Sequence, residues 1–256
     1  MIYAANVGFY GRGIRDHYQT FLRLCEEGEL IVAGGFEYLK WSVGEQVELW
    51  TRVNDGKAEP LFQSYYASDA RMTVALVEKM PRQDKALSDG AFLCRGGGFA
   101  GANWVAGRNP LIFDTPDFHR YDGLSLPRVC VVHLTGFAFR VNGFENEEEY
   151  DEAFPEDADG YGWDYRHLIP AFVLQPRGED GELQSAHARV SGFVRGAGII
   201  TNPETGLDFC WARLDTLGGD VDIVFAPDRL SGYLVAGGIA AAECYLYGRL
   251  AEDRCN

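Results

Sequence analysis

Short strand-like segments separated by glycine-containing turns fill most of the chain. Residues 30–79 contain four segments rich in β-branched and aromatic residues, and residues 54–57 read Asn-Asp-Gly-Lys, a sequence typical of a β-hairpin turn. The longest strand-like segment spans residues 127–141, and four more strand candidates follow residue 186. Runs of short strands without intervening helices favour antiparallel pairing. We therefore predict an α+β protein that is mainly antiparallel β.

Two segments depart from this pattern. Residues 14–27 follow a helical period, and a glycine is placed after them as a C-terminal cap. The apolar stripe of this predicted helix consists of Ile14, Tyr18, Phe21, Leu22 and Cys25. Residues 94–110 are so rich in glycine that we predict a loop rather than regular structure.

A further exception is an acidic stretch, residues 144–165, which contains ten carboxylates, six aromatic residues and no Lys or Arg. Asn146 followed three residues later by Glu149 is a capping-box pattern. Phe144 and Tyr150 have the spacing of a hydrophobic staple, and Pro155 ends the helical pattern. We therefore predict a short helix over residues 147–154, whose acids are explained by helix capping alone.

The rest of the acidic stretch has no period and is predicted to be a loop. It sets two large aromatic side chains among carboxylates, a combination that suits a basic protein partner because aromatics anchor and charges steer. The candidate binding residues are Asp157, Asp159, Tyr161, Trp163 and Asp164. A solvated loop without a partner is the alternative interpretation.

The chain divides into two predicted domains at a polar, glycine-containing segment, residues 172–184, which has the composition of a linker. We predict a β-rich α+β domain over residues 1–175, containing both helices, and a second domain over residues 184–256. The two halves echo each other in the order of strands and turns, but their identities are too few to indicate duplication.

The second domain reads as strand, turn, strand, Gly-Gly turn, strand, short irregular segment and strand, with Gly192, Gly196 and Gly198 inside its first strand. This order resembles the small Greek-key barrels of the OB-fold type, over about a quarter of the chain. The resemblance implies a face for single-stranded nucleic acid. Its candidate residues are Arg189, Arg195, Trp211 and Arg213, with Phe193 and Phe209 beside them. In the alternative, the aromatics are core and the arginines pair with nearby acids.

The distribution of charge argues against nucleic acid. The formal net charge is -15, and residues 129–256 hold 9 basic and 22 acidic residues, whereas residues 1–128 hold 14 and 16. Such a field repels phosphate backbones and attracts cations. The sequence therefore favours a non-catalytic acidic protein that binds a basic protein, such as an inhibitor or an immunity-type protein.

An enzyme is the alternative, as a hydrolase with a dispersed His/Cys/Asp site. No single catalytic residue stands out, because the chain lacks the usual hydrolase motifs and Cys130 and His133 are spaced to point to opposite faces of a strand. The glycine clusters at residues 8–13 and 96–101 match no phosphate-binding pattern, and residues 157–168 do not fit a calcium loop. We predict no cofactor and no metal.

The cysteines and the N-terminus indicate where the protein works. Six scattered cysteines without a C-x-x-C pair favour reduced thiols over a disulfide scaffold or a zinc site. The first residues lack a signal-peptide pattern, and no apolar stretch is long enough to span a membrane. We therefore expect a cytoplasmic protein that binds no membrane; its oligomeric state stays open.

Overall fold

The computed structural model describes residues 3–9, 14–82, 88–100, 103–155, 163–174 and 185–255. The predicted linker, from residue 175 onward, and residues 156–162 of the predicted acidic loop lie outside these ranges. Strands dominate and pair mainly antiparallel, so the predicted α+β class with a β-rich architecture is confirmed. None of the described helices is long and apolar enough to cross a membrane.

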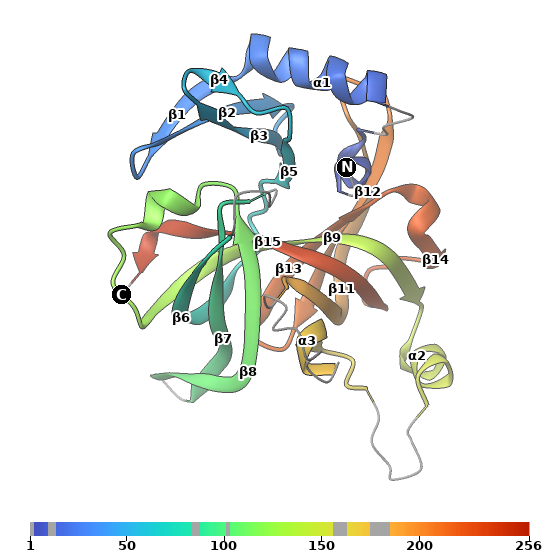
Figure 1. The fold of residues 1–256 in the computed structure, drawn as a ribbon. Helices are drawn as coiled ribbons and strands as arrows, with labels where there is room; N and C mark the ends of the chain where they lie inside the picture. The colour runs from blue at the N-terminus through green and yellow to red at the C-terminus, as the bar shows by residue number, and fades with distance from the viewer. Residues whose placement is uncertain are drawn as a thin grey trace.

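The N-terminal part of the chain forms a small antiparallel sheet covered by a helix (Figure 1). The 3-10 helix η1 (Ala4–Val7) precedes α1 (Ile14–Glu27). The sheet then follows as β1 (Glu29–Ala33), β2 (Phe36–Val43), β3 (Val47–Asn54), β4 (Lys57–Ala58) and β5 (Gln63–Tyr66).

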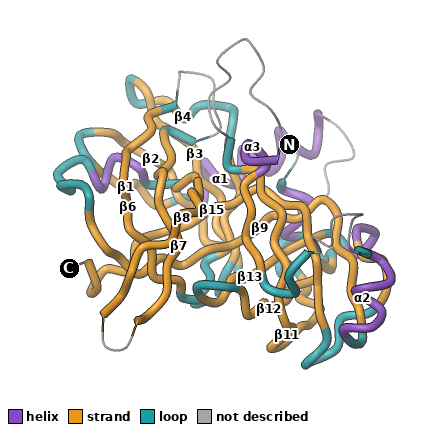
Figure 2. The backbone as a smooth tube through the Cα atoms, turned by 90° about the horizontal axis from the view of Figure 1, so that it is seen from below, coloured by secondary structure: helices purple, strands orange, loops and turns teal. Residues whose placement is uncertain are grey.

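Ten further strands form one continuous hydrogen-bonded sheet. They are β6 (Met72–Pro81), β7 (Gly90–Ala100), β8 (Asn103–Thr115), β9 (Arg128–Phe144), β10 (His167–Pro170), β11 (His187–Thr201), β12 (Asp208–Thr216), β13 (Gly219–Phe225), β14 (Leu230–Gly232) and β15 (Ile239–Cys255). The connections contain η2 (Phe118–Tyr121), α2 (Glu147–Ala153), α3 (Ala171–Leu174) and η3 (Pro227–Arg229). In Figures 1 and 2, α2 lies at the edge of the molecule, far from α1.

Five of these strands close a ring. β11 pairs with β12, β12 with β13, β13 with β9, β9 with β15, and β15 returns to β11. The β13–β9 pairing is parallel and the other four are antiparallel. The ring therefore combines four strands that follow residue 186 with β9, which precedes the segment predicted as a linker.

A second ring has the same plan. β6, β7 and β8 form an antiparallel meander, β8 pairs in parallel with β15, and β9 closes the ring by pairing with both β15 and β6. Each half of the chain thus supplies a three-stranded meander and one long strand, and β9 and β15 belong to both rings. The register of the strands agrees with this sharing of β9 and β15. Across β8, β15, β9 and β13, the residues that face one another in succession are Asp114, Tyr247, Thr135 and Asp222.

Both ends of this row are buried aspartates held by an arginine and a serine. Asp222 accepts hydrogen bonds from Arg213, with N–O distances of 2.9 and 3.0 Å, and from Ser68 at 2.7 Å. Asp114 accepts one from Arg82 at 2.8 Å and another from Ser88. A buried carboxylate is tolerated only when it is paired and hydrogen-bonded in this way.

The helix α1 begins and ends where the sequence predicts, but its buried side is different. Leu24 is fully buried, whereas Tyr18 is 59% exposed and Leu22 and Cys25 are also exposed. The His17 ring stacks on Phe62, with ring centroids 4.7 Å apart, and so turns this side of the helix toward the sheet. The predicted apolar stripe was therefore wrong for Tyr18, Leu22 and Cys25, whereas Phe21 packs against the same core cluster as Leu24.

Two other predictions are corrected. Most of the glycine-rich segment forms regular strand structure, with residues 94–100 in β7 and 103–110 in β8. Cβ atoms added at Gly96 or Gly98 would meet nothing within 4 Å, so these strand positions need no side chain. Cys130 is disulfide-bonded, so reduced thiols were wrongly predicted for it. It faces Cys255 across β9 and β15, a pairing that spacing along the sequence does not reveal.

The predicted short helix is confirmed as α2, together with its cap. The Asn146 Oδ1 atom accepts a hydrogen bond from the Glu149 N–H at 3.0 Å, and the Glu149 carboxylate accepts one from the Glu145 N–H at 2.9 Å. The rings of Phe144 and Tyr150 pack edge to face at 5.3 Å, as the staple requires. The acids of the first turn therefore stabilise the helix locally.

Replacing the capping side chain tests this interpretation. Asn146→Ala is expected to lower the free energy of unfolding by about 1 kcal/mol, because the Glu149 N–H loses its acceptor. Urea denaturation measures the change, and Asn146→Asp, which retains a capping oxygen, serves as the control. Equal destabilisation by both variants would contradict a capping role.

Candidate cation-binding groove

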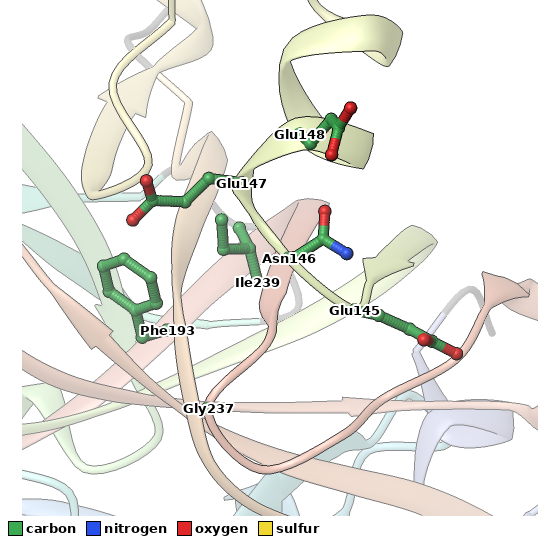
Figure 3. Close-up of a pocket in the computed structure, with 7 residues that line it drawn as sticks. All are labelled: Glu145, Asn146, Glu147, Glu148, Phe193, Gly237 and Ile239. Atoms are coloured by element: carbon green, nitrogen blue, oxygen red, sulfur yellow. The ribbon is translucent and has the colours of Figure 1, made fainter.

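A groove opens beside the start of α2. Three acidic residues at the start of α2 line it, together with Phe193 of β11 and Ile239 of β15, and its volume is about 410 Å³. Its carboxylates belong to Glu145, Glu147 and Glu148. Figure 3 shows Glu147 and Phe193 on the same side of the groove, whereas Glu145 and Glu148 point elsewhere. We call these five residues the acidic groove.

The closed ring brings the two sides of the groove together. Phe144, at the end of β9, pairs with Ile239, at the start of β15. The turn before β15 is fixed to β11 by two backbone hydrogen bonds of 2.8 Å, from Val194 to Gly238 and from Gly237 to Val194. Residues that enter α2 therefore lie over the junction of β11 and β15.

Glu145, Glu147 and Glu148 are all exposed, and none forms an ion pair within the part of the chain that the structure describes. Their neighbour Asp151 is engaged, because it accepts a hydrogen bond from the Tyr165 hydroxyl at 2.9 Å. That hydrogen bond raises the pKa of Tyr165 to about 12. The negative charge of the groove is therefore available to a partner.

The apolar side of the groove is rigid. Ile239 is fully buried, and the Phe193 ring packs 6.2 Å from the ring of Tyr165. The guanidinium of Arg166 lies 5.4 Å from the Phe193 ring centre and pairs with Asp215 at 3.5 Å. A long aliphatic side chain could pack on this surface while its charged end reaches the carboxylates.

The predicted binding loop is described only in part. Asp157, Asp159 and Tyr161 lie outside the described residues. Trp163 is half-buried, with the Arg189 guanidinium 4.9 Å from its ring centre and the His167 ring at 5.4 Å. Asp164 accepts a hydrogen bond from the Arg166 N–H at 3.0 Å through its carboxylate. Both residues pack the end of the loop against the sheet, beside the groove rather than in it.

None of the five groove residues was among the predicted binding residues. Phe193 and Ile239 are far from the acidic stretch in sequence, and only the pairing of β9, β11 and β15 brings them to it. No spacing pattern in the sequence indicates that these two residues lie beside the acidic stretch. The acids of the groove were recognised, but their role was assigned to helix capping alone.

The predicted nucleic-acid face is rich in ion pairs. Arg189 pairs with Glu243 at 3.2 Å, Arg195 with Asp215 at 3.0 Å and with Asp220 at 3.1 Å, and Arg213 with Asp222. Trp211 is half-buried beneath Arg213, and Phe209 is fully buried. These contacts match the alternative interpretation, in which the arginines pair with nearby acids; the face itself stays a prediction.

A dispersed catalytic site was the other alternative. The closest grouping is His119, whose Nδ1 lies 3.2 Å from Asp122 and whose Nε2 lies 4.0 Å from Asp89. The ring also stacks on Phe36 at 3.6 Å, as a packed structural residue does. Burial raises the pKa of the free thiols Cys94 and Cys244, which disfavours the reactive thiolate. Within the described residues, no cluster of His, Cys, Asp or Glu could hold a metal ion.

The comparisons with known proteins found no match for this chain. No protein-family model matches the chain, and neither a curated protein nor a solved structure matches it. A function for this protein therefore has to be argued from its own side chains.

Proposed function

We propose that the protein is a non-catalytic binding protein that captures a basic protein partner, as an inhibitor or an immunity-type protein does. The acidic groove receives a Lys or Arg side chain of that partner. The observation that carries this proposal is the groove itself, which three exposed glutamates without ion-pair partners in the described chain line together with Phe193; the Glu147 carboxylate lies on the same side as that ring (Figure 3).

The chemistry of the groove fits a long cationic side chain. The methylene groups of Lys or Arg pack on the half-buried ring of Phe193, and the charged end meets the carboxylates. Each exposed ion pair contributes little, about 0.2–1 kcal/mol, so the three together mainly select and orient the partner. The net charge of -15 adds long-range attraction for a basic surface.

The ring of β11, β12, β13, β9 and β15 supports a further proposal, that it is an OB-type unit. The ring and an OB-type barrel each consist of a three-stranded meander that two further strands close. We do not carry nucleic-acid binding over with it, because fold alone does not imply function and the acidic half repels phosphates. The expected cytoplasmic location stays a prediction.

Neutralising the groove tests the proposed function. The triple variant Glu145→Gln, Glu147→Gln, Glu148→Gln is expected to bind a fluorescent nona-lysine peptide about ten-fold more weakly, since three weak pairs sum to about 1.4 kcal/mol. Fluorescence anisotropy measures the affinity at low and at moderate salt. The variant should also lose part of the salt dependence of the wild type.

A matched variant separates the groove from general charge. Glu37, Glu45 and Glu78 are also exposed and form no ion pair within the described chain; they lie on β2, in the turn between β2 and β3, and on β6. Changing all three to Gln alters the net charge equally, and should weaken binding by no more than about two-fold. Equal losses in the two triple variants would refute a specific role for the groove.

A further inference from the structure

The turn between β14 and β15, residues 233–238, carries an exposed aromatic side chain next to the acidic groove. We propose that Tyr233 of this turn is the apolar anchor of the same binding surface, so that the partner presents an apolar side chain close to its Lys or Arg. This inference rests on the proposed function, because it names the kind of basic segment that the groove receives.

The turn exposes apolar surface. Tyr233 is 72% exposed, more than any other large apolar residue that the structure describes, and Val235 is 38% exposed. Between them, Leu234 packs against the main core. Tyrosine is enriched among the residues that dominate binding energy, because its ring offers a large contact area and loses little conformational freedom. Tyr233 and Val235 therefore form a surface on which an apolar side chain of a partner can pack.

The backbone of the turn places Tyr233 beside the groove. β14 pairs with the end of β9, and a Cβ atom added at Gly143 of β9 would collide with the backbone of Tyr233. Glu145 follows Gly143 by two residues, at most about 7 Å along an extended chain. At the other end of the turn, Gly237 lines the groove. In Figure 3, Glu145 points away from Phe193 and toward the segment that leads into Gly237. The turn therefore continues the acidic groove on the Glu145 side.

The turn is held in place at both ends. Gly232 precedes it with a φ of +79°, in the left-handed region that favours glycine. The Gly237 N–H donates to the Val194 oxygen at 2.8 Å, and the Gly238 N–H donates to the Val235 oxygen at 3.0 Å. A surface that is already ordered loses less entropy when a partner binds, so this turn is suited to anchor one.

The position of the anchor defines the partner segment. Alternate residues of an extended chain lie on one face, about 7 Å apart, and residues three or four apart share a face on a helix. A basic segment with an apolar residue about two to four positions from its Lys or Arg can therefore reach the groove and Tyr233 together. A segment that carries charge alone would engage only the groove.

Fluorescence anisotropy of two labelled peptides tests this anchor in the full chain. Both peptides contain nine lysines; one is interrupted near its centre by two leucines and the other by two serines. The wild type is expected to bind the leucine peptide about five-fold more tightly, because part of a leucine side chain is buried on the Tyr233 ring. Tyr233→Ser should abolish this preference and leave the serine peptide within about two-fold of the wild type.

Two further variants identify which claim fails. Tyr18→Ser is the matched control, since Tyr18 is also an exposed tyrosine but lies on α1, far from α2 (Figure 1), and it should retain the preference. The proposal is overturned if the wild type does not prefer the leucine peptide, if Tyr233→Ser keeps the preference, or if Tyr18→Ser loses it as well. Those results would leave the groove as a site, whereas unchanged affinity for both peptides in the triple groove variant would refute the proposed function itself.

Discussion

Replacing Arg249 by methionine is expected to lower the free energy of unfolding by about 3 kcal/mol, the low end for breaking a buried ion pair. Arg249 of β15 holds Glu48 of β3 through two contacts, of 2.6 and 3.2 Å, and Glu48 is only 8% exposed. The Trp50 N–H also donates to this carboxylate at 2.8 Å, and Lys40 lies 3.4 Å from it. Lys40 compensates partly for the lost arginine, which is why we expect the lower figure.

The dependence on pH distinguishes a lost charge pair from lost packing. Burial acts to raise the pKa of Glu48, but the hydrogen bonds and charge of Arg249 outweigh it and lower the pKa below 4.5. The pair therefore stabilises the wild type above the unfolded pKa, and this contribution is lost as the pH falls through the folded pKa. In Arg249→Met, acid instead neutralises the unpaired carboxylate, so the difference in stability from the wild type should shrink between about pH 7 and pH 4.

Urea denaturation of the wild type, the single variant and the double variant across that pH range measures the effect. The double variant Glu48→Gln, Arg249→Met should be more stable than Arg249→Met alone at neutral pH, because it no longer buries a charge. The ring centres of Trp50 and Tyr65 lie 4.9 and 4.2 Å from the Arg249 guanidinium. If the loss of stability in Arg249→Met is independent of pH and equal in the double variant, Arg249 acts by packing on these rings and not through its charge.

A fragment comprising residues 184–256 is expected to remain unfolded in isolation, a larger effect than any single substitution. The closed ring needs β9, which pairs with both β13 and β15. Phe137 and Val141 of β9 are fully buried, so the fragment would expose the apolar surfaces that cover them. Circular dichroism and the dispersion of amide NMR signals measure folding directly.

A permuted fragment provides the control. Joining residues 128–144 to the end of the fragment through a flexible linker restores all five strands of the ring, and it should recover cooperative unfolding. Cooperative folding of residues 184–256 alone would contradict the shared-strand arrangement and would support the predicted division into two domains.

Local sequence patterns predicted much of the fold. The helix α1, the cap and staple of α2, and the strands β9, β11 and β12 lie close to where the sequence places them, because these elements depend on neighbouring residues. The sharing of β9 and β15 by two rings was not predictable from such local patterns. It depends on pairings between residues more than one hundred positions apart, such as Tyr247 with Thr135.

The candidate sites, too, were predictable from the sequence only in part. The acids of residues 144–165 stood out by composition, but the partners Phe193 and Ile239 come from other strands. The glycines of residues 96–98 suggested a loop, since glycine weakens a strand. In the structure they belong to β7 and line a pocket, and a Cβ atom at Gly96 or Gly98 would meet nothing within 4 Å.

The position of a bound basic segment tests the proposed function without reliance on loss of affinity. A nona-lysine peptide carrying a central benzophenone, photo-crosslinked to the protein and mapped by mass spectrometry, reports which residues it contacts. Crosslinks should concentrate on residues 145–148 and Phe193, and should disappear in the triple groove variant. Crosslinks scattered over the acidic surface, or confined to faces away from α2, would contradict a cation-binding groove.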